Sequence, residues 1–254
     1  MTSYMEHKDL SNTDISEARA QEIRAGVAST VEALHNALDR AGRHDSDATL
    51  LAATKTRDVA EILTAIDAGI RCIGENRPQE ILAKAEGLQR GLEQRSLDVP
   101  LHMIGQLQAN KISKILPYTA VIESVDSLKL AERIARRVEN DSTVDVFLEV
   151  NVSGEESKSG CHLHEARDLA HEISALGTIR ITGLMTIGAH VHDEKIVRAG
   201  FENLRNMRDT LQSEGLTACT ELSMGMSADM EWAVAEGSTI VRVGTGIFGE
   251  RAFI

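Results

Sequence analysis

The sequence has few of the residues that would indicate a secreted, membrane-bound or metal-binding protein. Its cysteines, Cys72, Cys161 and Cys219, are odd in number and far apart, which suits neither a disulfide framework nor a zinc site. No run approaches the roughly 18 apolar residues of a membrane span, and the polar N-terminus lacks the apolar core of a signal peptide. We therefore expect a cytoplasmic protein that does not contact a membrane.

Basic residues are also in the minority. The chain has 27 Lys and Arg against 39 Asp and Glu, a formal net charge of −12. A surface that binds nucleic acid without regard to sequence needs clustered Lys and Arg. We expect no nucleic-acid partner, although a small positive pocket for an anionic ligand is compatible with this charge.

The chain is predicted to form one domain over 13–254, preceded by a mobile polar tail at 1–12. No linker or low-complexity segment divides it, and apolar positions at helical spacing predict an N-terminal helix over 14–41. Helical patterns then alternate with short apolar segments of strand length. The strands are predicted at 48–55, 71–75, 101–104, 120–125, 144–151, 179–186, 221–224 and 240–244.

Repeated strand–helix units of this kind form parallel sheets. Eight units in roughly 200 residues favour closure into an α/β (β/α)8 TIM barrel, here with an extra N-terminal helix. A doubly wound open sheet is the alternative, because strand order cannot be read from one sequence. The glycine-rich dinucleotide fingerprint of that fold is absent after the first predicted strand.

A lysine ends the first predicted strand. Side chains alternate along a strand, so Leu51, Ala53 and Lys55 share one face. If this face points inward, Lys55 lies at the mouth of the barrel, where TIM barrels carry their chemistry. The alternative is a solvated lysine at the start of a loop, because lysine is rarely buried without a partner.

The last predicted strand alternates an arginine and glycines with valines. Val241 and Val243 suit contact with the surrounding helices, which puts Arg242 inside the barrel. An arginine there is costly unless it is paired or lines a ligand cavity. Gly244 and Gly246 would let a ligand approach the backbone closely, so the pattern favours a ligand site over simple turn glycines.

Ser227 lies at a predicted strand-to-helix junction, and we expect it to be the N-cap of a helix over 229–236. The start of a helix binds anions through its N–H groups and dipole, and late βα loops of TIM barrels commonly bind phosphate. A cap without a ligand is the plainer interpretation. Together with Lys55 and Arg242, however, an anion site suggests a phosphorylated carbonyl ligand such as pyridoxal 5′-phosphate (PLP).

Other predicted strands also end in polar residues. His102 is of the kind that is usually a core histidine, and Glu149 and Asn151 share a face from which they could pair with Arg242. Two histidine pairs lie in predicted loops without acidic companions, so we predict no metal site. These pairs are His162 with His164 and His190 with His192.

Several motifs occur in the order found in one protein family. They are Thr54-Lys55-Thr56, Ile73-Gly74-Glu75-Asn76, the stretch from His102 to Lys111, Ser157-Lys158-Ser159-Gly160, Gly183-Leu184-Met185, Leu222 to Ser227, Gly237-Ser238-Thr239, Val241 to Thr245, and Ile247-Phe248-Gly249. Over roughly residues 48–250 the chain resembles the YggS/PROSC family of PLP homeostasis proteins. This resemblance implies a barrel like the N-terminal domain of alanine racemase.

The resemblance also implies residue roles. Lys55 would hold PLP as a Schiff base, and Ser227, Gly244 and Thr245 would bind its phosphate. Arg242 would face the pyridine nitrogen and keep it unprotonated by like-charge repulsion.

Two further residues, Asn76 and His102, would line the pocket according to the resemblance. The sequence departs from the family at Arg77, where many relatives have tyrosine. A stacking or phosphate-binding role of that tyrosine therefore does not carry over.

An unprotonated pyridine is a weaker electron sink, and alanine racemases draw a second catalytic base from a C-terminal β-domain. This chain ends soon after Gly249, and its tyrosines, Tyr4 and Tyr118, are not placed as an obvious base. We therefore assign no catalytic residue. We expect a monomeric PLP carrier that acts in intracellular vitamin B6 and amino-acid homeostasis, with PLP-requiring apo-enzymes as candidate partners. A PLP-dependent racemase of low activity and an unrelated sugar-phosphate-binding barrel are the alternatives.

Overall fold

The computed structural model describes residues 9–139, 142–155, 158–189, 191 and 193–250. In this part of the chain, eight parallel strands close into a barrel in the order β4-β3-β2-β1-β9-β8-β7-β5, and β4 pairs with β5. The barrel strands are β1 (Thr49–Ala53), β2 (Cys72–Glu75), β3 (Leu101–Met103), β4 (Val121–Val125), β5 (Val144–Asn151), β7 (Ile179–Met185), β8 (Glu221–Ser223) and β9 (Ile240–Val243). The predicted TIM barrel is confirmed, and each barrel strand overlaps one of the predicted strands.

One strand that the sequence did not suggest is β6 (Cys161–His162). Among the described residues it pairs with the end of β5 alone, in a small second sheet outside the closed barrel. Two residues are too short a segment for period-two alternation to be recognised.

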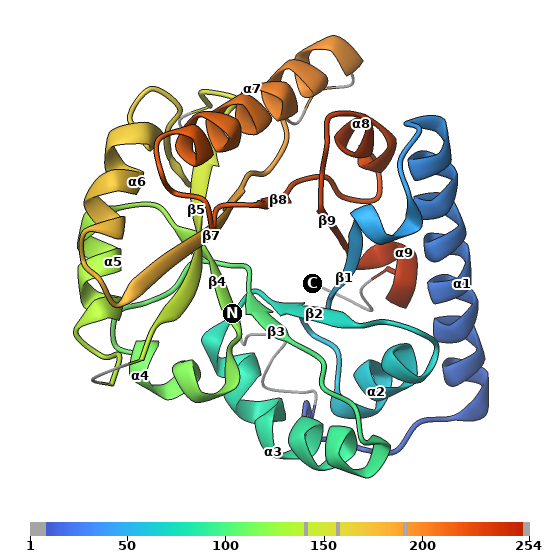
Figure 1. The fold of residues 1–254 in the computed structure, drawn as a ribbon. Coiled ribbons are helices and arrows are strands. Elements are labelled where there is room, and N and C mark those ends of the chain that lie inside the picture. The colour runs from blue at the N-terminus through green and yellow to red at the C-terminus, as the bar shows by residue number, and fades with distance from the viewer. Residues whose placement is uncertain (1–8, 140–141, 156–157, 190, 192, 251–254) are drawn as a thin grey trace.

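Helices surround the barrel (Figure 1). They are α1 (Glu17–Arg40), α2 (Val59–Asp67), α3 (Pro78–Arg95), α4 (Ile112–Ile115), α5 (Leu128–Ala135), α6 (Ala166–Ser174), α7 (Glu194–Ser213), α8 (Met230–Ala235) and α9 (Thr245–Phe248), with 3-10 turns η2 (Asp45–Asp47) and η3 (Leu116–Tyr118). Within the described residues, none of these helices combines the length and apolarity needed to cross a membrane.

The predicted N-terminal helix is α1, which lies outside the barrel against α2, α8 and α9. Its buried face includes Ile23, Val27, Leu34 and Leu38 at the predicted helical spacing. A Cβ atom on Gly26 would lie 2.3 Å from the carbonyl oxygen of Ile247. The helix therefore approaches α9 closely, and this contact supports the segment that follows β9.

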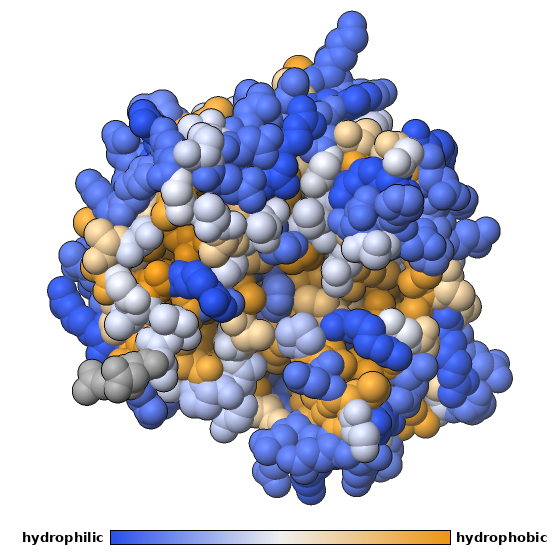
Figure 2. All heavy atoms as spheres, viewed as in Figure 1, coloured by the Kyte–Doolittle hydropathy of each residue, from blue (hydrophilic) through white to orange (hydrophobic). Residues whose placement is uncertain are grey.

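The core has two layers, as the alternation along each strand requires. A large outer layer fills the space between sheet and helices and includes Val241 and Val243. A smaller cluster fills the barrel interior, with Leu51 and Ile240 among its members. Viewed along the barrel, hydrophilic residues dominate the periphery and apolar residues appear towards the middle (Figure 2).

Of the predicted tail at 1–12, the structure describes the part from residue 9 onwards. Residues 1–8, which include Tyr4, lie outside the described residues. Leu10 is buried, and its carbonyl oxygen accepts a hydrogen bond from the Val59 backbone N–H at 3.1 Å. The Asn12 carbonyl accepts one from Ala60 at 3.0 Å. These residues satisfy N–H groups that the first turn of α2 cannot satisfy itself.

Candidate functional site

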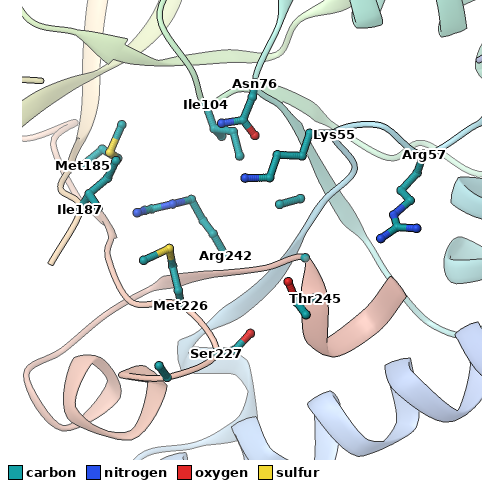
Figure 3. Close-up of a pocket in the computed structure, with 13 residues that line it drawn as sticks. Lys55, Arg57, Asn76, Ile104, Met185, Ile187, Met226, Ser227, Arg242 and Thr245 are labelled. Carbon is teal, nitrogen blue, oxygen red and sulfur yellow. The ribbon is translucent and has the colours of Figure 1, made fainter. Parts of the chain in front are cut away.

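A cavity of about 360 Å³ opens at the C-terminal ends of the barrel strands (Figure 3). The residues that line it come from the ends of β1, β2, β3, β7 and β9 and from the loop between β8 and α8. They are Ala53, Lys55, Arg57, Asn76, Ile104, Met185, Ile187, Met226, Ser227, Ala228, Arg242, Gly244 and Thr245. Six of the seven predicted site residues therefore line one cavity, and His102 does not.

Lys55 lies in a turn directly after β1. The strand ends at Ala53, two residues earlier than predicted, although the Thr54 backbone N–H still donates to the Gly74 carbonyl of β2 at 2.9 Å. In Figure 3 the Lys55 side chain points into the space bounded by Asn76 and Arg242. The inward face predicted from strand alternation is the one that the structure shows.

Arg242 forms part of the cavity floor and is only 7% exposed. Its Nη1 atom donates to Ser223 Oγ at 2.6 Å, and its Nη2 atom donates to the Thr186 carbonyl at 2.7 Å. Burial lowers the pKa of Arg242, and nearby carboxylates that include Glu123 and Glu149 oppose this shift. The side chain remains a fixed positive charge facing the cavity.

The suggested pairing of Arg242 with strand β5 is found only in part. Glu149 interacts with the guanidinium electrostatically. Asn151 instead turns toward the loop after β5, where its Nδ2 atom donates to the Glu155 carbonyl at 2.8 Å. The loop after β5 is thus held by Asn151, and the guanidinium hydrogen bonds go to Ser223 and Thr186.

His102 lies inside the barrel, away from the cavity wall, and this corrects the expectation that it lines the pocket. Its Nδ1 atom is 2.6 Å from Glu123 Oε1, and Ser223 Oγ donates to Glu123 Oε2 at 2.5 Å. Burial alone lowers the pKa of His102, but hydrogen bonds with Cys72 and Glu123 outweigh burial and raise this pKa to about 10. His102 is therefore a cation paired with Glu123, one layer beneath the cavity.

Ser227 is not the N-cap of the helix that follows it, contrary to the sequence-based expectation. The N-cap of α8 is Asp229, whose Oδ1 atom accepts a hydrogen bond from the Met226 backbone N–H at 2.6 Å. Gly225 has a φ of +92°, and a Cβ atom there would lie 2.4 Å from Cβ of Ala233. This sharp turn brings Ser227 to the cavity wall.

The segment after β9 lies beside Ser227, since a Cβ atom on Gly246 would lie 3.6 Å from Ser227 Oγ. Gly244 and Thr245 line the wall where α9 begins, and a Cβ atom on Gly244 would lie 3.2 Å from the Ala53 carbonyl. The first N–H groups of a helix have no acceptor within it. Backbone N–H groups here and the hydroxyls of Ser227 and Thr245 form a donor set suited to an anion.

Asn76 supplies a further polar group to the wall. Its Oδ1 atom is buried without a hydrogen-bond partner among the described residues. Buried polar atoms nearly always have a partner, so this atom is consistent with a polar group of a ligand. Strand alternation gave no signal for Asn76, which lies just beyond the end of β2.

Sequence reasoning missed Arg57 and the apolar side of the cavity, formed by Ile104, Met185, Ile187 and Met226. Arg57 donates from Nη2 to the Gly249 carbonyl at 2.8 Å and lies over the Phe248 ring at 5.5 Å. In Figure 3 it points away from Lys55. Its contacts hold the end of α9, and no periodic pattern marks such a loop residue.

The three cysteines are free and buried. Among the described residues, no group of three or more His, Cys, Asp or Glu side chains is arranged to hold a metal ion. The His162 and His164 rings stack with centroids 5.5 Å apart, whereas His190 and His192 lie outside the described residues.

Residues 29–252 match the protein family described as the alanine racemase N-terminal domain. A pyridoxal phosphate homeostasis protein of Aquifex aeolicus is 41% identical over 224 residues, which cover 88% of this chain and 96% of that protein. The chain belongs to the pyridoxal phosphate homeostasis protein family. The resemblance seen in the ordered motifs is thereby confirmed.

Solved structures of similar proteins have the same fold. An unknown protein from Bifidobacterium adolescentis is 55% identical, with a TM-score of 0.93, and the match covers 95% of this chain and all of that one. PipY of Synechococcus elongatus, solved with PLP bound, is 34% identical with a TM-score of 0.74. That match covers 89% of this chain and 100% of PipY.

Proposed function

We propose that this chain binds PLP as a Schiff base on Lys55 and acts in intracellular PLP and amino-acid homeostasis, without robust catalysis of its own. The observation that carries this proposal is the convergence of Lys55, Arg242, Ser227 and Thr245 on one cavity. Bound PLP supplies an aldehyde that condenses reversibly with an amine. PipY with PLP bound, and relatives named as pyridoxal phosphate homeostasis proteins, support the choice of ligand.

The residues present fit the chemistry of this cofactor. Ser227, Gly244 and Thr245 would hold the phosphate through hydroxyl and backbone N–H groups, and the orphan oxygen of Asn76 would meet a polar group of the ring. Arg242 would face the ring nitrogen. A fixed positive charge there disfavours protonation of that nitrogen.

The cavity wall favours a carrier over a racemase. Among the described residues that line it, Lys55 is the one amine, and there is no tyrosine, histidine, cysteine or carboxylate. Tyr118 is 44% exposed and lies in η3, outside this wall. A two-base racemase needs a second acid–base group within reach of the substrate. As the sequence suggests, we propose that the protein is a cytoplasmic monomer that passes PLP to apo-enzymes.

Attachment at Lys55 is tested by adding PLP to the purified protein, reducing with borohydride and mapping the modified peptide. We expect a visible absorption band and one modified lysine, Lys55, with both lost in Lys55→Ala. Lys111→Ala is the matched control and should bind as wild type does. Modification of Lys111 or Lys158 in place of Lys55 would overturn the assignment.

The carrier role is tested by following deuterium exchange at Cα of several L-amino acids with the PLP-loaded protein. We expect exchange far slower than enzymatic turnover. Turnover of about 1 per second or more, in the range of ordinary enzymes, would favour the racemase instead. Lys55→Ala serves as the blank in this assay.

A further inference from the structure

An ion cluster with no exposure to solvent lies next to the turn that carries Lys55. Lys84 of α3 is 2.6 Å from Glu75 Oε1 at the end of β2 and 2.9 Å from Glu80 Oε2 in the first turn of α3, measured from Nζ. All three side chains are 0% exposed. We refer to these three residues as the Lys84 cluster.

The Lys84 cluster holds both chain neighbours of Lys55. Lys84 Nζ donates to the Thr54 carbonyl at 3.0 Å, and Thr54 Oγ1 donates to a Glu75 carboxylate oxygen at 2.6 Å. On the other side of Lys55, the Thr56 backbone N–H donates to Glu80 Oε2 at 2.6 Å. The turn is thus fixed immediately before and immediately after the lysine.

The backbone of this turn needs such support. Thr56 has a φ of +66°, and in the described part of the chain Ser96 is the other non-glycine residue with a positive φ. A β-branched residue in this region is strained, and such strain persists only where surrounding contacts enforce it. The bond from Thr56 to Glu80 is one of these contacts. Relaxation of Thr56 would rotate the peptide that joins it to Lys55.

Stability alone does not explain the Lys84 cluster. Buried ion pairs are often no more stabilising than apolar residues of the same size, and here one cation faces two carboxylates. Burial raises the pKa of Glu75, with Lys84 opposing this shift and Glu80 adding to it. Within the described part of the chain, Glu75 Oε2 and Glu80 Oε1 are buried without hydrogen-bond partners. The cluster therefore carries an energetic cost at the place where its contacts fix the turn.

We propose that Lys84 is a positioning residue, which together with Glu75 and Glu80 fixes the 54–56 turn so that Lys55 points into the cavity. This inference rests on the proposed function, because it assigns how the lysine is presented to PLP. Lys84 itself is not among the residues that line the cavity.

The main test is Lys84→Met, which keeps the length and apolar stem of the side chain and removes its charge and donors. In the cofactor-free protein we expect amide hydrogen exchange at Thr56 to accelerate about tenfold or more. Formation of the Lys55 adduct with PLP should slow by a similar factor or more, because small misplacements of a reacting group have effects of this size. Leu211→Ala, at a fully buried site in α7, is the control for general destabilisation. It should lower the melting temperature and change neither rate.

A second pair of variants serves if Lys84→Met does not fold. Glu80→Gln keeps an oxygen that can accept the Thr56 N–H, whereas Glu80→Ala removes it. In Glu80→Gln we expect Thr56 exchange to stay slow and adduct formation to be near normal. In Glu80→Ala we expect faster Thr56 exchange and slower adduct formation. A purely structural role would instead make both rates follow the melting temperature in all variants.

The two proposals fail in different ways. If wild-type protein forms no adduct on Lys55, the proposed function is wrong, and Thr56 exchange in Lys84→Met still tests whether the Lys84 cluster holds the turn. If wild type forms the adduct and both Lys84→Met and Glu80→Ala keep wild-type rates, the positioning role alone is overturned.

Discussion

Arg242 and Ser223 form a 2.6 Å hydrogen bond between neighbouring strands β9 and β8, with the guanidinium as donor. The same serine hydroxyl donates to Glu123 of β4, which contacts His102 of β3. Four side chains from four strands thus form one polar chain through the barrel interior. The position of the arginine in the cavity floor depends on residues that do not line the cavity.

Removing the Ser223 hydroxyl should therefore be costly. In Ser223→Ala, a buried carboxylate and a buried guanidinium each lose a partner, which costs about 1–3 kcal/mol of unfolding free energy for such groups. Urea denaturation measures this change, and PLP affinity should fall because Arg242 is less well held. The matched control is Ser238→Ala, a fully buried serine whose hydroxyl bonds to backbone carbonyls, with a cost of about 1 kcal/mol. Equal losses in the two variants would contradict the role of the polar chain.

The alternation along β1 and β9 favoured an inward Arg242 and made Lys55 a candidate for the cavity, with a solvated loop lysine as the alternative. Side-chain direction in a strand is a local property, and the apolar neighbours Leu51 and Val243 mark the two core layers. Closure of the barrel was favoured only by the number of strands. It depends on the pairing of β4 with β5, which no local pattern encodes.

The rest of the site depends on contacts between distant segments. His102 was expected in the pocket, but its partner Glu123 on the adjacent strand holds it one layer deeper. The N-cap of α8 is Asp229, two residues after Ser227, and its carboxylate accepts from the Met226 backbone N–H instead of capping the helix. Lys84 lies four residues after Glu80, a spacing typical of exposed helical ion pairs, and only tertiary packing buries it.

The pairing of His102 should give a pH dependence of stability. Its pKa in the folded protein is about 10, against an ordinary value of 6.5, so folding favours the protonated ring. The stabilisation is fully present below about pH 6.5 and is lost as pH rises through about 10. The stability difference between wild type and His102→Gln should shrink by on the order of 3 kcal/mol over this window. Denaturation curves at pH 6 and pH 10 measure it, and a difference independent of pH would refute the pairing as a source of stability.

Glu149 should also make stability fall as pH rises, but in a lower pH window and because folding favours its uncharged form. Burial, with Asp126 and Glu123 adding and Arg242 opposing, raises the pKa of Glu149 from 4.5 to about 7. The folded protein then binds a proton that the unfolded chain has released, so stability falls as pH rises from about 4.5 to about 7. Glu149→Gln removes this loss.

We expect Glu149→Gln to be more stable than wild type by about 1–3 kcal/mol at pH 8, with a smaller difference at pH 4. Urea denaturation at the two pH values checks this. Glu172→Gln, at an exposed position in α6, is the control and should change stability little at either pH. An equal gain at both pH values would mean that the gain in Glu149→Gln does not come from the charge.

Ser96 follows the last residue of α3 in the left-handed conformation, with φ of 51° and ψ of 39°. Its N–H bonds to Glu93, and the next N–H, of Leu97, bonds to Leu92, which closes the helix end. Glycine adopts this conformation without the steric cost of a Cβ atom. Ser96→Gly should therefore raise the unfolding free energy by about 0.5–1 kcal/mol, less than the full steric term because glycine also gains freedom in the unfolded chain. Ser174→Gly, within right-handed α6, should instead lower it by about 0.5 kcal/mol. Thermal melting of both variants checks this. A lower melting temperature in both would show that loss of the Ser96 side chain costs more than relief of its backbone strain gains.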